Sequence, residues 1–249
     1  MDVFFIGVGE ACDSEHGNTS VLVTTGPGVR VLCDCGFSVP HHFFRICDDP
    51  DGLEMVWISH FHGDHYFGLP LLLLRFWEMR RSRPLVIAGQ AGVAGQVRKS
   101  FDMAYSGFAD KLCYPLDFIE IEPGESRQHA GLTMQTVQTV HSRRNLGLLL
   151  DDGDRKLYYS GDGRPSADVA ALARDCDLAV HEAFKLEDEF PGHGSINGCL
   201  RLAEKARIKR LALVHLERGV RREQADAISD ILARNPSATL PVEGTRISL

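Results

Sequence analysis

The sequence predicts an α/β protein in which two β-sheets pack face to face and helices cover their outer faces. Short runs of β-branched and other apolar residues, bounded by Gly or Pro, open each half of the chain and predict strands. Strand and helix patterns then alternate toward the end of each half, as in layered α/β folds. The 249 residues contain no internal repeat and no long linker, so we expect a single domain over residues 1–249.

In the first half, three strand-like runs come before any helix, at residues 3–8, 20–24 and 29–34. A further strand at 55–59 ends in polar residues and leads into one predicted helix at 65–81. The basic end of that helix suits the negative pole of the helix dipole, although Pro70 lies inside it. A strand at 85–88 and a helix at 91–105 complete this half.

The second half repeats the pattern. Predicted strands cover residues 116–121, 132–140, 146–150, 156–160, 178–181 and 210–214. Predicted helices cover residues 167–174, 196–207 and 222–234. The turn Asp151-Asp152-Gly153-Asp154 predicts a plain hairpin between two of these strands.

Composition limits the function classes. The net charge of -7, from 34 acidic and 27 basic residues, argues against a broad nucleic-acid footprint but allows a local basic patch. The N-terminus lacks the pattern of a signal peptide, and the longest apolar stretch, residues 69–74, is too short to span a bilayer. The seven cysteines are scattered, and Cys33 and Cys35 suit small apolar positions on a buried strand. We therefore expect a cytoplasmic protein with reduced thiols and no membrane partner.

The strongest functional signal is the run from Ser59 to His65. It places His60, His62, Asp64 and His65 within six residues, directly after a predicted strand. Gly63 is expected to allow the tight turn that lets them converge. Imidazole and carboxylate groups are the ligands of zinc and similar metals, so this run predicts a metal site.

Three later residues share the same local context. His141, Asp162 and His215 each follow a predicted strand, and active sites in α/β proteins gather at the carboxyl ends of strands. Each residue alone is also compatible with a surface position. Together with the first motif, they form a set of seven candidate metal ligands.

These motifs resemble the metallo-β-lactamase fold superfamily, whose H-x-H-x-D-H motif is followed by a His, an Asp and a His. Within it, the ribonuclease Z branch is similar in the run from Ser59 to Pro70 and in Tyr159-Ser160-Gly161-Asp162. It is also similar in His181-Glu182-Ala183, in Gly192-His193-Gly194-Ser195 and in Asn18-Thr19-Ser20.

The resemblance implies an αββα four-layer sandwich and two divalent metal ions, zinc first and manganese as the alternative. His60, His62 and His141 would hold one ion. Asp64, His65 and His215 would hold the other, and Asp162 would bridge both. It also implies a homodimer, for which residues 67–76 offer an apolar surface, although a core role explains these residues equally well.

Two such ions would lower the pKa of a shared water and supply a metal-bound hydroxide near neutral pH. We expect Asp64 to orient this nucleophile, His193 to act as a non-ligand acid and Glu182 to orient His193. His193 also fits a structural place beside the helix cap Ser195, and Glu182 fits a structural carboxylate.

Arginines stand close to three of the ligand positions. They are Arg143, Arg144, Arg164 and Arg218. Arginine binds phosphate through its planar donor fork, so this recurrence favours a phosphodiester substrate over an uncharged one. Each arginine taken singly suits a solvated surface.

Several departures from the ribonuclease Z pattern bear on the substrate. The long arm that grips tRNA is replaced by the hairpin between His141 and Asp162. The P-x-K-x-R-N loop is replaced by residues 12–18, and Phe184 stands in place of a Thr. The leading hypothesis is therefore a metal-dependent phosphodiesterase acting on a small or short nucleotide-like substrate, and full-length tRNA is expected to be a poor substrate. The alternatives are a short-form tRNA 3′-processing endoribonuclease, a lactone or thioester hydrolase, and a catalytically idle binding protein.

Overall fold

Two β-sheets form the centre of the molecule, which the computed structural model describes over residues 1–187 and 190–249. The strands of the first sheet are β1 (Asp2–Gly7), β2 (Ser20–Thr24), β3 (Arg30–Cys33), β4 (Leu53–Ile58), β5 (Leu85–Gly89), β6 (Leu116–Glu120) and β14 (Arg246–Ser248). Those of the second are β7 (Ser126–His129), β8 (Leu132–Gln138), β9 (Leu146–Asp151), β10 (Lys156–Tyr159), β11 (Leu178–Glu182), β12 (Leu211–Val214) and β13 (Ala238–Thr239). Their spatial orders are β14-β1-β2-β3-β4-β5-β6 and β13-β12-β11-β10-β9-β8-β7.

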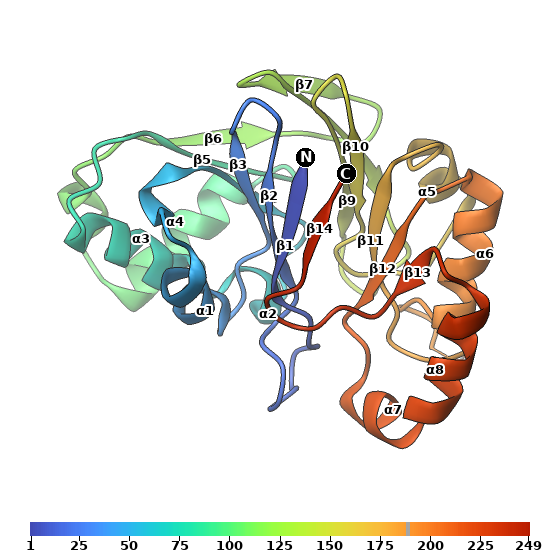
Figure 1. Cartoon of the computed structure of the whole chain (residues 1–249). Helices are drawn as coiled ribbons and strands as arrows, with labels where there is room; N and C mark the ends of the chain where they lie inside the picture. The colour runs from blue at the N-terminus through green and yellow to red at the C-terminus, as the bar shows by residue number, and fades with distance from the viewer. Residues whose placement is uncertain (188–189) are drawn as a thin grey trace.

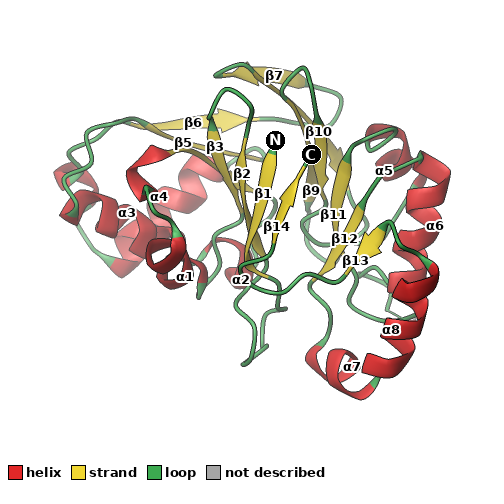
Figure 2. Ribbon diagram, viewed as in Figure 1, coloured by secondary structure: helices red, strands yellow, loops and turns green. Residues whose placement is uncertain are grey.

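Helices cover the outer face of each sheet. Those on the first sheet are α1 (Val39–Ile46), α3 (Leu69–Glu78) and α4 (Val93–Ala104), and those on the second are α5 (Ala167–Leu172), α6 (Ile196–Ala206) and α8 (Ala225–Arg234). Two short helices, α2 (Gly63–Tyr66) and α7 (Arg218–Glu223), lie at the lower edge in Figure 1. Short 3₁₀ turns occupy Pro50–Gly52 and Ala109–Lys111. Figure 2 shows helices, sheet, sheet and helices in succession, so the predicted αββα four-layer sandwich is confirmed.

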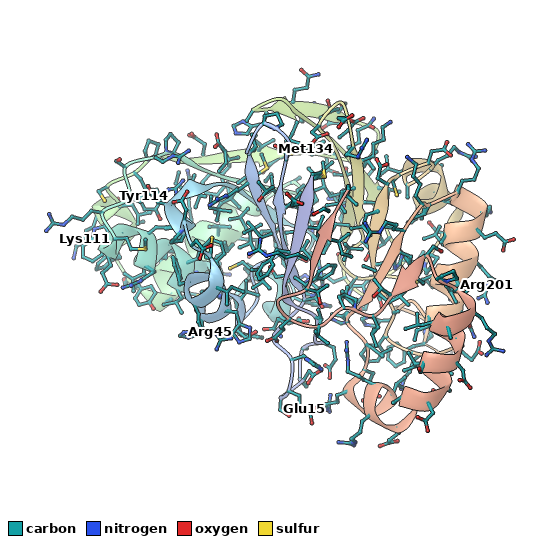
Figure 3. The ribbon with its side chains drawn as sticks, viewed as in Figure 1. Glu15, Arg45, Lys111, Tyr114, Met134 and Arg201 are labelled. Atoms are coloured by element: carbon teal, nitrogen blue, oxygen red, sulfur yellow. The ribbon has the colours of Figure 1, made fainter. Side chains whose placement is uncertain are left out.

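The central strands are apolar on both faces because the middle of each sheet is buried on both sides. In β4, Met55 and Trp57 face the core between the sheets, whereas Val56 and Ile58 face the helices. This double burial explains why the strand reads as a continuous apolar run rather than an alternating one. Met134, which Figure 3 labels, lies in the same core between the sheets.

Two predicted helices are interrupted in the structure. The helix expected over residues 65–81 is divided into α2 and α3, because Gly68 packs its backbone against the preceding loop. Its N–H donates to the Cys35 carbonyl at 2.8 Å, and a Cβ there would lie 2.1 Å from the Gly36 oxygen. Pro70, in the first turn of α3, suits a helix start. The helix expected over residues 222–234 likewise becomes α7 and α8.

Some elements were not predicted. They are α1 and the strands β7, β13 and β14. β13 has two residues and β14 has three, which is too short for a periodic pattern to indicate a strand. Cys33 and Cys35 are both buried, Cys33 between the sheets and Cys35 under the helices, as expected of small apolar side chains.

One end of the double sheet collects the carboxyl ends of several strands. β3 and β4 run parallel in the first sheet, as do β10, β11 and β12 in the second. β8 and β10 both pair antiparallel with β9, so β8 ends on the same side as β10. All the candidate site residues follow or end these strands, so the fold brings them to one edge.

Candidate metal centre

The first candidate ligands lie in the loop that leaves β4. This loop is anchored through Ser59, whose backbone N–H and hydroxyl donate to the Asp34 carboxylate at 2.8 and 2.7 Å. Gly63 does not form the predicted tight turn: it begins α2 and lies outside the left-handed region. A Cβ at this position would lie 2.5 Å from Cζ of Phe37, so glycine is required by the close approach of that ring.

Three imidazoles form the first group of candidate ligands. His60 Nε2 lies 3.0 Å from His62 Nδ1, and His141 Nε2 lies 3.2 Å from the same atom. Asp162 turns its Oδ2 toward them, 3.8 Å from His60 Nε2 and 3.7 Å from His141 Nε2. The four donor atoms therefore face a common point.

Asp64, His65 and His215 form the second group. Asp64 Oδ2 lies 3.3 Å from His65 Nε2 and 3.4 Å from His215 Nε2. Asp162 presents its other oxygen here, because its Oδ1 lies 3.3 Å from His65 Nε2 and 3.5 Å from His215 Nε2. One carboxylate thus faces both groups, one oxygen to each.

The donor sets fit divalent cations. Four ligands at zinc distances form a tetrahedron with edges of about 3.3 Å, close to the distances between the donor atoms in both groups. His65 Nε2 and Asp162 Oδ1 are buried and have no hydrogen-bond partner within the described part of the chain. Buried polar atoms normally have partners, and a cation would satisfy both of these. The residues present therefore suit the metal ions that the motif predicts.

The electrostatics of the centre also favour positive charge. Burial alone would raise the pKa of Asp162, but the charges of His215 and His65 hold it well below its usual range. Burial opposes protonation of His215 as well, yet Asp162 and Asp64 raise its pKa to about 9. Burial and the charge of His65 hold the pKa of His60 well below its usual range. The buried carboxylates are therefore stable only with positive charge beside them.

Asp34 supports the centre from behind and was missed in the sequence. Its Oδ2 accepts hydrogen bonds from His65 Nδ1 at 2.7 Å, from the Tyr159 hydroxyl at 2.8 Å and from the Ser59 hydroxyl. Its φ of 61° lies in the left-handed region, where non-glycine residues are uncommon and often functional. Its position directly after β3 was the available signal, and it matches that of the predicted ligands.

The side chains of His193 and Glu182 lie in contact. His193 Nδ1 lies 3.1 Å from Glu182 Oε1. The fully buried Glu182 carboxylate also accepts hydrogen bonds from three backbone N–H groups, those of Gly163, Phe184 and Gly194. A nitrogen of His193 approaches Asp162 and His215, since one donor atom of each lies within 4.8 Å of the others. His193 is therefore beside the second group, with its Nδ1 held by a fixed acceptor.

The Phe184 ring packs against His193. The two rings stack at 4.7 Å between centroids, with 30° between their planes. His141 is held from the same loop, since its Nδ1 lies 2.8 Å from the Gly192 carbonyl. The loop between β11 and α6 thus positions both histidines.

The four arginines near the ligands are not equivalent. Arg144 forms an ion pair with Glu122, and Arg218 forms one with Glu10, so both are neutralised within the protein. Arg143 and Arg164 have no ion-pair partner among residues 1–187 and 190–249. Of the four arginines expected to favour an anionic substrate, Arg143 and Arg164 therefore remain available to one.

Comparisons with known proteins identify the family to which this fold belongs. The family model of the β-lactamase superfamily domain matches residues 29–216. The chain is 24% identical to a ribonuclease Z of Methanosarcina acetivorans over 270 residues, 87% of each protein.

Solved structures share the fold. The short form of human tRNase Z matches with a TM-score of 0.81 at 22% identity, covering 100% of this chain and 99% of that one. A diphosphatase of the PhnP family matches with a TM-score of 0.75 at 16% identity, covering 100% and 97%. At these identities the likeness establishes the fold.

The class of enzyme follows from the family match and the site. The prediction of a hydrolase that depends on divalent metal is therefore confirmed for the class of enzyme. No described helix has the length and apolar character needed to cross a bilayer. The family model covers most of the chain, and its relatives include ribonuclease Z. This protein therefore belongs to the metallo-β-lactamase superfamily, in its ribonuclease Z-like branch.

Proposed function

We propose that this protein is a phosphodiesterase that uses two divalent metal ions, zinc or manganese, to cleave a short nucleotide-like phosphodiester. The observation that carries the proposal is the orientation of Asp162, whose two oxygens face the two groups of candidate ligands separately. His60, His62 and His141 would hold one ion, and Asp64, His65 and His215 the other. A carboxylate placed in this way suits two ions about 3.5–4 Å apart.

The residues around the ions have separate tasks in the proposed reaction. When bound, the two ions lower the pKa of water and neutralise charge on the phosphoryl oxygens. Asp64 has one oxygen turned to the second group and would accept a hydrogen bond from the attacking water with the other. Asp64, His65 and His215 are buried, and the low local dielectric strengthens the electrostatic interactions of this second group.

His193 would protonate the leaving oxygen or stabilise charge in the transition state. With Nδ1 donating to Glu182, the ring presents Nε2 to the substrate side. Glu182 is held by backbone donors on three sides and cannot turn away, so it acts as a positioning residue. Phe184 limits the ring to one plane by stacking on it.

The relatives called ribonuclease Z support an internucleotide phosphodiester as the substrate. The human structure called tRNase Z also supports a second candidate, processing of tRNA at its 3′ end. Against a tRNA grip, β9 and β10 are joined by a tight turn at Asp152–Arg155, with no arm.

The basic surface considered as a substitute for the arm consists of Arg75, Arg80, Arg81 and Arg83, and most of its charge is neutralised or buried. Arg81 is buried and donates to backbone carbonyls, among them Leu53 at 2.6 Å. Arg75 pairs with Glu78, and Arg83 lies 3.8 Å from Glu54. Of these four side chains, Arg80 alone has no ion-pair partner among the described residues. We therefore favour the short substrate.

A panel of substrates on metal-loaded protein tests the proposal. It compares bis(p-nitrophenyl) phosphate, a dinucleotide, a tRNA precursor, a lactone and a thioester at physiological salt. We expect the short diesters to be cleaved fastest. Faster hydrolysis of the lactone or thioester contradicts the proposed reaction, and efficient 3′ cleavage of the precursor makes tRNA processing the function.

Homodimerisation is a separate proposal about partners. Leu69, Leu72 and Phe76 are buried in the core, which supports the core role for these three of residues 67–76. An apolar face nevertheless remains, because Phe37, Phe67 and Met103 are 55%, 48% and 79% exposed. Light scattering at several concentrations tests it, and Phe67→Glu should give monomers. The cytoplasmic location stays a prediction.

A further inference from the structure

A basic hollow lies on the outer side of the second helical layer, between the start of α5 and α6. It has a volume of about 280 Å³. Arg164 and Ser166 line it from the loop before α5, and Arg201 and Lys205 line it from α6. Gly198 and Ala170, which have small side chains, also line it. Figure 3 shows Arg201 on the outer side of α6.

The charge of this hollow contrasts with that of the protein. Three of its lining residues are basic and none is acidic, although the chain as a whole carries a net charge of -7. Arg164 and Lys205 form no ion pair with any carboxylate in the described ranges of the chain. The other ligand-loop arginines with comparable positions, Arg144 and Arg218, are neutralised by Glu122 and Glu10. Arg164 is therefore available to an anion from outside.

The hollow adjoins the proposed metal centre. Arg164 is two residues from Asp162, a separation that spans at most about 7 Å of chain. Its backbone N–H donates to the carbonyl of Val140, the residue before His141. The next residue, Pro165, packs against Gly194, since a Cβ on that glycine would lie 3.4 Å from Pro165 Cδ. The loop that carries Asp162 thus continues into the lining of the hollow and contacts the loops of His141 and His193.

We propose that the hollow binds a second phosphate of the substrate, next to the diester that is cleaved. This inference rests on the proposed function and names its substrate class: nucleotides that carry a phosphate beside the scissile one. The guanidinium of Arg164 offers a planar pair of donors to phosphate oxygens, and Lys205 adds a mobile positive charge. Such contacts position a nucleic-acid chain without reading its bases.

Steady-state kinetics with matched dinucleotides tests the substrate part of the proposal. The substrates are UpU and its 5′-phosphorylated and 3′-phosphorylated forms, which differ only in the second phosphate. We expect one phosphorylated form to have a KM about tenfold lower than that of UpU. In the double variant Arg164→Gln/Lys205→Gln, this ratio of KM values should fall to about one. Lys111→Gln, on the opposite helical layer, is the matched control and should keep the ratio.

Binding of inorganic phosphate to metal-free protein, followed by calorimetry, provides a readout that does not depend on activity. We expect binding by the wild type and the control variant, and its loss in the double variant. Equal KM values for the three dinucleotides in the wild type, or an unchanged ratio in the double variant, overturns the proposal. Phosphate binding without any preference among the dinucleotides indicates a free-anion site and also overturns it. If no diester is cleaved, the proposed function fails, whereas the calorimetry still decides whether the hollow binds phosphate.

Discussion

The two groups of candidate ligands differ in charge and in exposure. His60, His62 and His141 are three imidazoles, and among them the His62 ring is partly exposed, whereas the His141 side chain is 1% exposed. Asp64, His65 and His215 are all buried and include a carboxylate. The second group also has Asp34 behind it, 2.7 Å from His65 Nδ1, whereas the first is supported by neutral groups, the Ser59 hydroxyl and the Gly192 carbonyl.

This difference indicates that the two groups have unequal affinity for their ions. A carboxylate behind a ligating histidine raises its basicity and fixes its ring, and such partners contribute strongly to affinity. We therefore expect the second group to retain its ion more tightly and the first to exchange with solvent. The shared residue Asp162 couples them, so perturbing it should affect both, and perturbing an outer partner should affect one more than the other.

The largest expected effect comes from Asp162→Ala. This change removes the oxygen that faces each group, so both ions should be lost and turnover should fall by at least about 10⁴-fold, as for other central catalytic groups. Elemental analysis and diester hydrolysis measure the two results. The exposed Asp168→Ala is the control. Retention of one ion with full activity would show that the two groups do not share a bridging ligand.

His193→Ala should reduce turnover by about 10²–10⁴-fold, the usual contribution of a positioned acid. Metal content should stay unchanged, because His193 belongs to neither group in the proposal. Loss of the second ion would instead make His193 a ligand, as its approach to Asp162 and His215 permits. Glu182→Gln keeps the size of the partner and should give a smaller loss through misplacement of the ring.

Sequence and structure agree where chemistry is concentrated in one segment. Five of the seven candidate ligands follow strands predicted within a few residues, and the other two, Asp64 and His65, lie in α2 directly after them. They could be predicted because His and Asp after an apolar strand stand out. Asp34 was missed since it stands alone, and its partners Ser59, His65 and Tyr159 come from distant segments.

The ion pairs of two arginines also could not be predicted from the sequence. Arg144 meets Glu122 and Arg218 meets Glu10 only after folding, so their neutralisation leaves no local pattern. The break between α2 and α3 also depends on a tertiary contact, the approach of Gly68 to Cys35 and Gly36. Local preference predicts elements, and long-range contacts decide where they end.

Asp34→Asn tests whether the charge behind His65 causes the difference in affinity between the two groups. The amide keeps the shape of the side chain but removes the charge behind His65. We expect affinity for the second ion to fall by about 10–100-fold and affinity for the first to change much less. Competition with a chromophoric chelator, resolved into two binding steps, measures both. Equal losses in the two steps would remove the distinction between the groups.

Ser59→Ala should give the smallest effect, and it tests whether the two groups are connected behind the ligands. Ser59 Oγ lies 3.1 Å from His60 Nδ1 and donates to Asp34 Oδ2 at 2.7 Å. With its proton directed to Asp34, the hydroxyl oxygen is left to accept from His60. Removing the hydroxyl leaves the buried His60 Nδ1–H without an acceptor. Asp34 keeps its hydrogen bonds from His65, Tyr159 and the Ser59 backbone N–H. Because a neutral hydrogen bond contributes less than a charged one, we expect affinity for the first ion to fall less than about tenfold. Affinity for the second ion should stay nearly constant, and Ser59→Thr should restore the first. A larger loss in the second group would mean that the hydroxyl acts mainly through Asp34.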